Sequence, residues 1–245
     1  MAPGPRSDGP APAGPALDDP TGGPPVAAVP ARRPPASAAD ERIRVVTGLR
    51  PDGAFDHGKI RAGVSLILEG LGLDPEDPRT RDTPDRVARM YDEIFAGLLV
   101  RPADVLDVVF EEGHDEIVMV RDIPFGSICE HHLIPFVGKA HVGYVPNAQG
   151  QVTGISKLAR LVDLVAKRPS LQERITSTVA DTMVSALDPR GVIVVIEAEH
   201  FCMTMRGVRK PGAVTVTSAV RGTMREDPRT RAEAMSLLGL RLGGI

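Results

Sequence analysis

The chain has 245 residues, of which 29 are basic and 32 acidic, and its formal net charge is −3. This balance excludes a generic binder of nucleic acid or acidic membranes, which would usually carry a basic excess, and eight aromatic residues without tryptophan offer few surfaces for base stacking. Two cysteines cannot form a disulfide scaffold, and no apolar run approaches the ~18 residues that a membrane span needs.

The N-terminal segment differs in composition from the rest of the chain. Residues 1–40 contain 11 Pro, 10 Ala and 5 Gly and no aromatic residue. Such a segment buries too little apolar surface to offset its ordering entropy, so we expect a disordered tail over 1–40. It also lacks a charged stretch followed by an apolar one, so no secretory signal is predicted. We therefore expect a cytoplasmic protein with reduced thiols.

Helical spacing of apolar residues marks the start of the folded part. The stripe in residues 59–71 predicts one helix. The pair Thr83-Pro84 predicts the start of a second helix, with Thr83 as its N-cap and Pro84 at the first helical position. Apolar positions continue at helical spacing as far as Leu98, so this helix is expected to be long.

The central part of the chain predicts four strands around two helices. Strands are expected at 116–125 and 137–145, and again at 192–205 and 213–220. Between the two pairs, Ser156 and Ser170 are expected to cap two amphipathic helices, which end before Pro169 and Pro189. Asp227-Pro228 begins a short terminal helix. The order, helices and then ββααββ and a helix, predicts an α+β domain with an antiparallel sheet.

Both cysteines and three of the six histidines fall in two short segments, CEHH at 129–132 and HFC at 200–202. On a strand, His200 and Cys202 would share a face, with Cα atoms ~6.5–7 Å apart. Thiolate and imidazole are preferred zinc ligands, and Cys129, His132 and Cys202 would leave a fourth position open, as in catalytic zinc sites. His131 and His200 would remain beside the metal as proton carriers.

Simpler interpretations of these residues stay open. A free cysteine often behaves as a small buried hydrophobe, and Cys129 and Cys202 could instead form a disulfide, although this does not suit a reducing compartment. His57, His114 and His141 are expected to be ordinary surface or strand histidines. The joint pattern favours a metal site over these alternatives.

Two basic clusters predict anion binding. In GISKLAR at 154–160, a helix N-terminus beside Lys157 and Arg160 would attract a phosphate. A second cluster, Arg206, Arg209 and Lys210, follows the HFC segment. Each cluster could equally be a solvated basic face.

The segment SLQE at 170–173 has two interpretations. Ser170 and Glu173 match a capping box, in which the two residues satisfy backbone amides at a helix start. Alternatively, Glu173 accepts hydrogen bonds from a guanidine-like edge of a ligand, with help from Gln172. Spacing alone favours the capping box.

Taken together and in order, these motifs resemble GTP cyclohydrolase I. The resemblance rests on CEHH at 129–132, GISK at 154–157, RP at 168–169 followed by QER at 172–174, and HFCM at 200–203 through RG at 206–207. It covers about residues 59–238, so 41–245 is expected to form the catalytic domain. The resemblance implies the tunnelling fold (T-fold) and a toroidal homodecamer of two pentamers. It also implies hydrolytic ring opening of GTP to formate and 7,8-dihydroneopterin triphosphate, at the start of tetrahydrofolate and pterin biosynthesis.

The resemblance also implies roles for particular residues. The family's zinc ligands match Cys129, His132 and Cys202. Its acid–base pair matches His131 and His200. Its guanine-recognising pair matches Glu173 and Gln172, which reverses the preference for a capping box. The contacts to ribose and triphosphate match Ser156, Lys157, Arg160 and Arg206. An arginine that reaches in from a neighbouring subunit matches Arg86.

Two other functions compete with this interpretation. One is a sibling enzyme of the same fold that acts on another purine or pterin. The presence of Lys157, Arg160, Arg206 and Arg86 favours a triphosphate substrate and so disfavours this alternative. The other is a zinc-stabilised oligomeric scaffold that binds nucleotides without turnover. Such a scaffold would need neither His131 nor His200, and the sequence has both.

Overall fold

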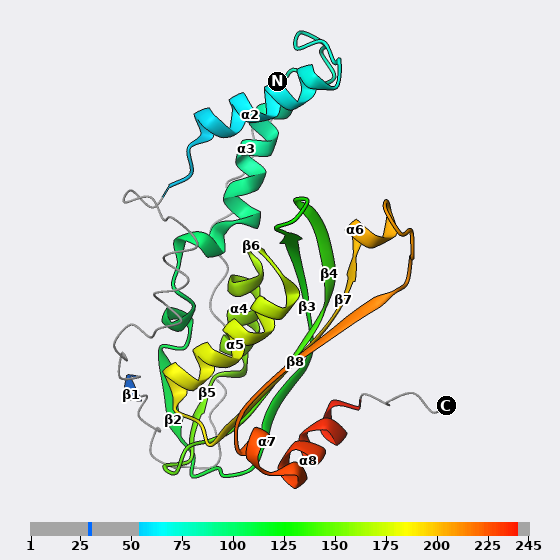
Figure 1. Cartoon of the computed structure of the whole chain (residues 1–245). Helices are drawn as coiled ribbons and strands as arrows, with labels where there is room; N and C mark the ends of the chain where they lie inside the picture. Colours follow the sequence, from blue (N-terminus) through cyan, green and yellow to red (C-terminus); the bar gives the residue numbers. More distant parts are fainter. Residues whose placement is uncertain (1–28, 31–53, 240–245) are drawn as a thin grey trace, which may run out of the picture.

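The computed structural model describes Val29–Pro30 and residues 54–239 (Figure 1). The predicted disordered tail, 1–40, lies outside these residues except for β1 (Val29–Pro30), which pairs antiparallel with β2 (Val108–Glu111). The boundary of the catalytic domain at residue 41 also lies outside them and remains a prediction.

Two helices form an arm that extends away from the sheet (Figure 1). They are α2 (His57–Gly70) and α3 (Thr83–Ile94), which is followed by the short 3-10 helix η1 (Ala96–Leu99). Within the described chain α2 buries none of its residues, and Ile67 of its predicted apolar stripe is 63% exposed. The arm therefore presents apolar surface that the described residues do not cover.

The main sheet has the predicted ββααββ connectivity. Its strand order is β6-β3-β4-β7-β8, and each of the four long strands runs antiparallel to its long neighbours: β3 (Val118–Cys129), β4 (Ile134–Val145), β7 (Gly191–His200) and β8 (Val214–Gly222). The short β6 (Pro169–Ser170) runs parallel to the end of β3. Between the strand pairs, α4 (Ile155–Ala166) and α5 (Gln172–Leu187) lie over one face (Figure 1). The α+β prediction is confirmed.

The apolar start of β7 is explained by burial on both faces. Val192, Val194 and Ile196 belong to the main core beneath α4 and α5. The alternate residues Ile193 and Val195 join a second core with α7 (Thr223–Glu226) and α8 (Pro228–Leu238). A strand covered on both faces loses its polar alternation, as the sequence shows here.

Three predicted N-caps are wrong, whereas the predicted start of the terminal helix at Asp227-Pro228 is confirmed. Asp82, not Thr83, precedes α3, and Gly154 rather than Ser156 precedes α4. Ser170 is held in β6 by pairing with Cys129, so α5 begins two residues later, without a side-chain cap among the described residues. Tertiary pairing has overridden the local capping signal.

The strand predicted over 192–205 ends at His200. The chain then turns into the one-turn helix α6 (Phe201–Thr204), in which the Thr204 hydroxyl donates to the His200 carbonyl at 3.2 Å. His200 and Cys202 therefore do not alternate along one strand, and the Cα separation predicted for them does not apply.

None of the helices in the described part of the chain combines the length and apolar character needed to cross a membrane.

A buried histidine lies beside an irregularity in the sheet. The pairing of β3 with β4 shifts register between Val120 and Ile123, and Asp122 adopts a positive φ of 56°. The Asp122 amide donates to Nδ1 of His141 at 3.2 Å, and His141 is only 4% exposed. Nε2 of His141 has no hydrogen-bond partner among the described residues. Protonating Nδ1 would break the bond from Asp122, so the fold favours the neutral ring.

The protein should lose stability as the pH falls below about 6.5, partly through His141. Burial lowers the pKa of His141; Asp122 and Glu197 oppose this, and Lys139 and Arg121 add to it. The unfolded state therefore binds the extra proton more readily, and unfolding becomes more favourable in acid. Urea unfolding between pH 7.5 and 5.5 should show a shallower loss for His141→Asn, whose side-chain oxygen can still accept from Asp122.

The matched control is His114→Asn, which changes an exposed histidine. Its pH dependence should follow that of the unsubstituted protein. If the free energy of unfolding of His141→Asn and of the unsubstituted protein falls equally with pH, His141 does not contribute to the acid sensitivity.

Candidate active site

The turn between β3 and β4 carries the first predicted segment. Cys129 is the last residue of β3 and is 4% exposed, because its strand pairs with both β4 and β6. The Leu133 amide donates to the Cys129 carbonyl at 2.9 Å and closes the turn. His131 and His132 are consequently exposed at its tip.

The second sulfur comes from α6. The pKa of the Cys202 thiol is raised, mainly by burial and further by the adjacent Cys129 thiol. Both cysteines are free, so the alternative of a disulfide is not realised. The fold brings two soft ligands together from segments far apart in the sequence.

The third predicted metal ligand, His132, contacts an arginine. Nη1 of Arg206 lies 3.0 Å from Nε2 of His132. A guanidinium only donates, so Nε2 must present its lone pair, which is the form of imidazole that binds metals. Within residues 54–239, however, no group of three or more His, Cys, Asp or Glu side chains is close enough to hold a metal ion. The donor types fit zinc, although the structure gathers only the two sulfurs.

His200 is clamped from two directions. Its ring stacks on Phe136, which lies opposite on β4, with centroids 4.5 Å apart and an interplanar angle of 3°. Its Nε2 lies 2.8 Å from Oε1 of Gln172. Burial lowers the pKa of His200, and the Glu173 carboxylate partly opposes this effect. The ring is thus held in one orientation.

Gln172 and Glu173 begin α5 but face different surroundings. Gln172 is 1% exposed and bonded inside the fold, whereas Glu173 is exposed. The capping box is not formed: Ser170 Oγ lies 3.3 Å from the Leu171 carbonyl, and α5 has no side-chain cap within the described residues. The Glu173 carboxylate is therefore not used to start the helix.

The GISK residues lie at the other end of the helix layer. β6, beside Cys129, follows the C-terminal end of α4, whereas Ser156, Lys157 and Arg160 lie toward its N-terminal end next to β5 (Gln151–Thr153) (Figure 1). With 12 residues, α4 is about 18 Å long. One chain therefore holds the predicted site residues other than Arg86 in two groups, one toward each end of α4.

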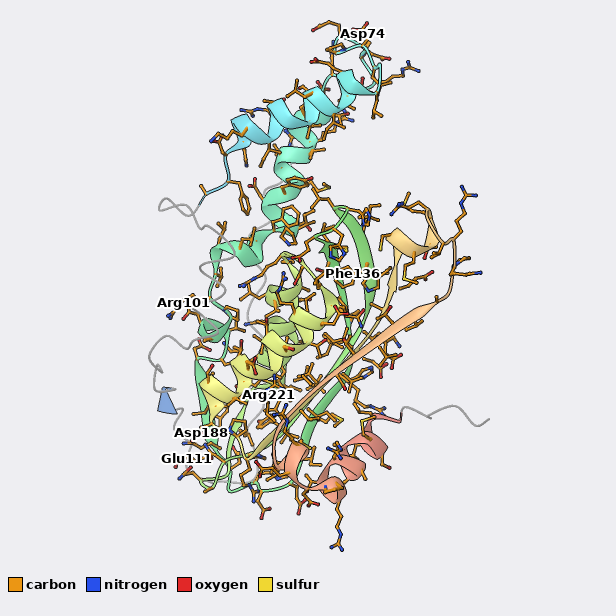
Figure 2. All side chains as sticks on the ribbon, in the orientation of Figure 1. Asp74, Arg101, Glu111, Phe136, Asp188 and Arg221 are labelled. Atoms are coloured by element: carbon orange, nitrogen blue, oxygen red, sulfur yellow. The ribbon has the colours of Figure 1, made fainter. Side chains whose placement is uncertain are left out.

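The positions and contacts of further residues agree with this separation of the site residues into two groups. Figure 2 shows Phe136 toward the β3–β4 turn and Glu111, which pairs with β5, toward the opposite end of the sheet. Lys157 forms an ion pair with Asp107, with Nζ and Oδ1 2.6 Å apart. Arg86 lies on the helical arm, within 3.6 Å of the Asp82 carboxylate.

Sequence reasoning missed an ion pair that ties the turn to α5. The guanidinium of Arg174 bonds both carboxylate oxygens of Glu130, with Nη2 3.1 Å from Oε1. This contact lowers the pKa of Glu130. Both residues belong to quoted motifs, but no local spacing indicates a contact across 44 positions.

Comparison with known proteins gives a consistent result. The family model of GTP cyclohydrolase I matches residues 60–239. GTP cyclohydrolase 1 of Halalkalibacterium halodurans is 62% identical over 183 residues, which cover 75% of this chain and 97% of the relative. The Thermobifida fusca protein of the same name is 61% identical over 191 residues, 78% of this chain and 92% of the relative. The chain belongs to the GTP cyclohydrolase I family.

A solved structure gives a weaker likeness. The archaeosine synthase QueF-Like in its apo form covers 44% of this GTP cyclohydrolase I family chain and 94% of its own, at 20% identity and a TM-score of 0.36. That overlap is too small to bear on the fold.

In this member of the GTP cyclohydrolase I family, Arg174→Met should loosen the β3–β4 turn without unfolding the protein. The pair is partly exposed, so its loss should lower the free energy of unfolding by less than about 1 kcal/mol. Amide hydrogen exchange at residues 130–133 should nevertheless accelerate, because Glu130 loses its anchor on α5.

The control Arg225→Met removes an exposed arginine from α7. It should leave exchange in the turn unchanged. Equal exchange rates in all three proteins would show that the ion pair does not order the turn.

Proposed function

We propose that this chain opens the imidazole ring of GTP by zinc-dependent hydrolysis, releases C8 as formate and forms 7,8-dihydroneopterin triphosphate. The observation that carries the proposal is the convergence of Cys129, Cys202 and His200 at one end of the sheet, beside the turn that presents His131 and His132. The reaction begins tetrahydrofolate and related pterin biosynthesis.

We assign the metal to Cys129, His132 and Cys202. Two thiols and one imidazole suit zinc and leave a coordination position open. Zinc held by these residues would supply a hydroxide nucleophile near neutral pH. We place the protein in the cytoplasm, where the free thiols stay reduced.

We assign proton transfer to His131 and His200. Ring opening and release of formate each consume one water and break one bond between C8 and a nitrogen. Each departing nitrogen needs a proton, and histidine is suited to supply it near neutral pH. The fixed ring of His200 and the exposed ring of His131 would supply the protons for these two bond cleavages.

Substrate recognition is divided between the two groups of residues. Glu173 can accept hydrogen bonds from the amino and ring N–H groups of guanine, because its carboxylate is exposed and no cap occupies it. Arg206 stands beside His132 for the phosphates or ribose. Ser156, Lys157 and Arg160 offer a helix N-terminus with two cations for the triphosphate.

An oligomeric barrel would complete the site. The two groups lie toward opposite ends of α4, a helix about 18 Å long, and this arrangement favours a site shared between two chains. β8 forms an edge of the sheet with Val214 and Val216 more than half exposed, and such an edge favours pairing with another chain. Arg86 lies on the helical arm, from which it would reach into the site of a neighbouring chain. The resemblance supplies the stoichiometry, a decamer of two pentamers.

Purified protein supplied with zinc and GTP should release formate and develop pterin absorbance. His131→Ala and His200→Ala should retain zinc and lose about 10²- to 10⁴-fold in turnover, because each removes a proton carrier. Cys129→Ala and Cys202→Ala should lose zinc, as measured by elemental analysis.

Stoichiometric zinc in either cysteine variant would contradict the ligand assignment. Nucleotide binding without product would favour a scaffold, and neither binding nor product would favour a sibling enzyme with another substrate.

Co-assembly of two inactive variants tests the shared site. Lys157→Ala and His131→Ala chains, each inactive alone, should recover about a quarter of the unsubstituted activity when mixed equally, since a quarter of sites then draw intact residues from two chains. Native mass spectrometry should verify the mixed particles. Mixed particles without activity would show that both residues act from the same chain.

A further inference from the structure

Gln172 has an environment unlike that of a ligand-binding side chain. It is 1% exposed, in the first turn of α5. Its amide nitrogen lies 3.0 Å from the carbonyl oxygens of Ile196 on β7 and Thr215 on β8, and 3.1 Å from the Thr217 hydroxyl. The amide therefore bridges α5 to two neighbouring strands.

These contacts fix which way the amide faces. Backbone carbonyls only accept hydrogen bonds, so the group facing Ile196 and Thr215 must be the NH₂. The reversed amide would set its oxygen against two carbonyl oxygens inside the fold, where such unpaired acceptors are costly. The orientation follows from the partners.

The opposite end of the amide then determines the state of His200. Oε1 of Gln172 lies 2.8 Å from Nε2 of His200, and an amide oxygen only accepts. Nε2 must therefore carry the hydrogen. Nδ1 has no hydrogen-bond partner in the part of the chain that the structure describes, and it keeps its lone pair in the neutral ring.

The hydroxyls of two threonines, Thr176 and Thr217, stabilise this position of Gln172. The Thr176 hydroxyl donates to the backbone carbonyl of Gln172 at 2.7 Å. Its oxygen lies 2.6 Å from that of Thr217, which must donate because Thr176 has a single hydrogen. The hydroxyls thus form a directed chain, and neither competes for the bond between Gln172 and His200.

We propose that Gln172 is a positioning residue that holds His200 in the Nε2–H tautomer, with Nδ1 available to GTP, and that its side chain does not contact guanine. This differs from the resemblance, which pairs Gln172 with Glu173 in guanine recognition. The inference rests on the proposed role of His200 as a proton carrier. Recognition of the guanine edge then falls to Glu173.

The tautomer is measurable without any variant. Solid-state ¹⁵N spectra of histidine-labelled, zinc-loaded protein should show one ring protonated at Nε2 whose signals disappear in His200→Asn. An Nδ1–H tautomer, or a mixture, in the signals lost on this substitution would overturn the proposal. This spectrum does not depend on turnover, so its result is independent of the proposed function. A fully active His200→Ala enzyme would refute the role of His200 as a proton carrier, but not the tautomer that the spectrum reports.

Kinetics distinguish positioning from substrate contact. Gln172→Met keeps the length of the side chain and removes its polar atoms. In folded, zinc-containing protein it should lower kcat about 10- to 100-fold, as the loss of an orienting partner does, and leave KM for GTP within about twofold. Its His200 signals should become a mixture of tautomers.

The matched control is Glu173→Gln, one position away on the same helix turn. It should raise KM far more than it lowers kcat. A raised KM with unchanged kcat for Gln172→Met would show that Gln172 binds guanine, and would overturn the proposal. If Gln172→Met does not fold, the spectrum of the unsubstituted protein still decides.

Discussion

The short parallel pairing of β6 with the end of β3 determines where the site forms. Ser170 pairs with Cys129, and its carbonyl accepts from the Glu130 amide at 3.2 Å. Because α5 starts directly after this bridge, its first turn must begin beside the β3–β4 turn. Gln172 can then reach His200, and Arg174 can reach Glu130. Two residues of strand thus align a helix, a turn and the end of β7.

The sequence predicted the architecture well because its periodicities follow burial. The ββααββ order and the terminal helix could be read from apolar spacing, since two cores absorb the two faces of β7. Helix starts were less predictable. A serine before an apolar stripe is a capping signal only where nothing else constrains it, and the pairing of Ser170 with β3 does.

The sequence singled out a set of candidate site residues, which stays a prediction, but it did not indicate their contacts. The clustering of cysteine and histidine indicated a metal site, whereas the end of β7 at His200 left no mark in the composition. Gln172 shows the limit most clearly, since its partners Ile196, Thr215 and Thr217 lie 24 to 45 positions away. The sequence analysis gave Gln172 only a role in assisting Glu173 to contact a ligand, and the fold buries its side chain instead.

The distribution of charge explains how a mildly acidic chain would handle a triphosphate. Under the proposed function the cations that bind the phosphates are few and local: Arg206 lies beside His132, whereas Lys157 and Arg160 lie on α4 toward the opposite end of the helix layer. Under the proposed function, His131, His200 and the metal ligands act from one chain while Lys157 and Arg160 act from another. Assembly would then complete the phosphate-binding site, while His200 is already oriented within each chain. Such an enzyme needs no basic surface, because the interface between copies concentrates positive charge only where substrate binds.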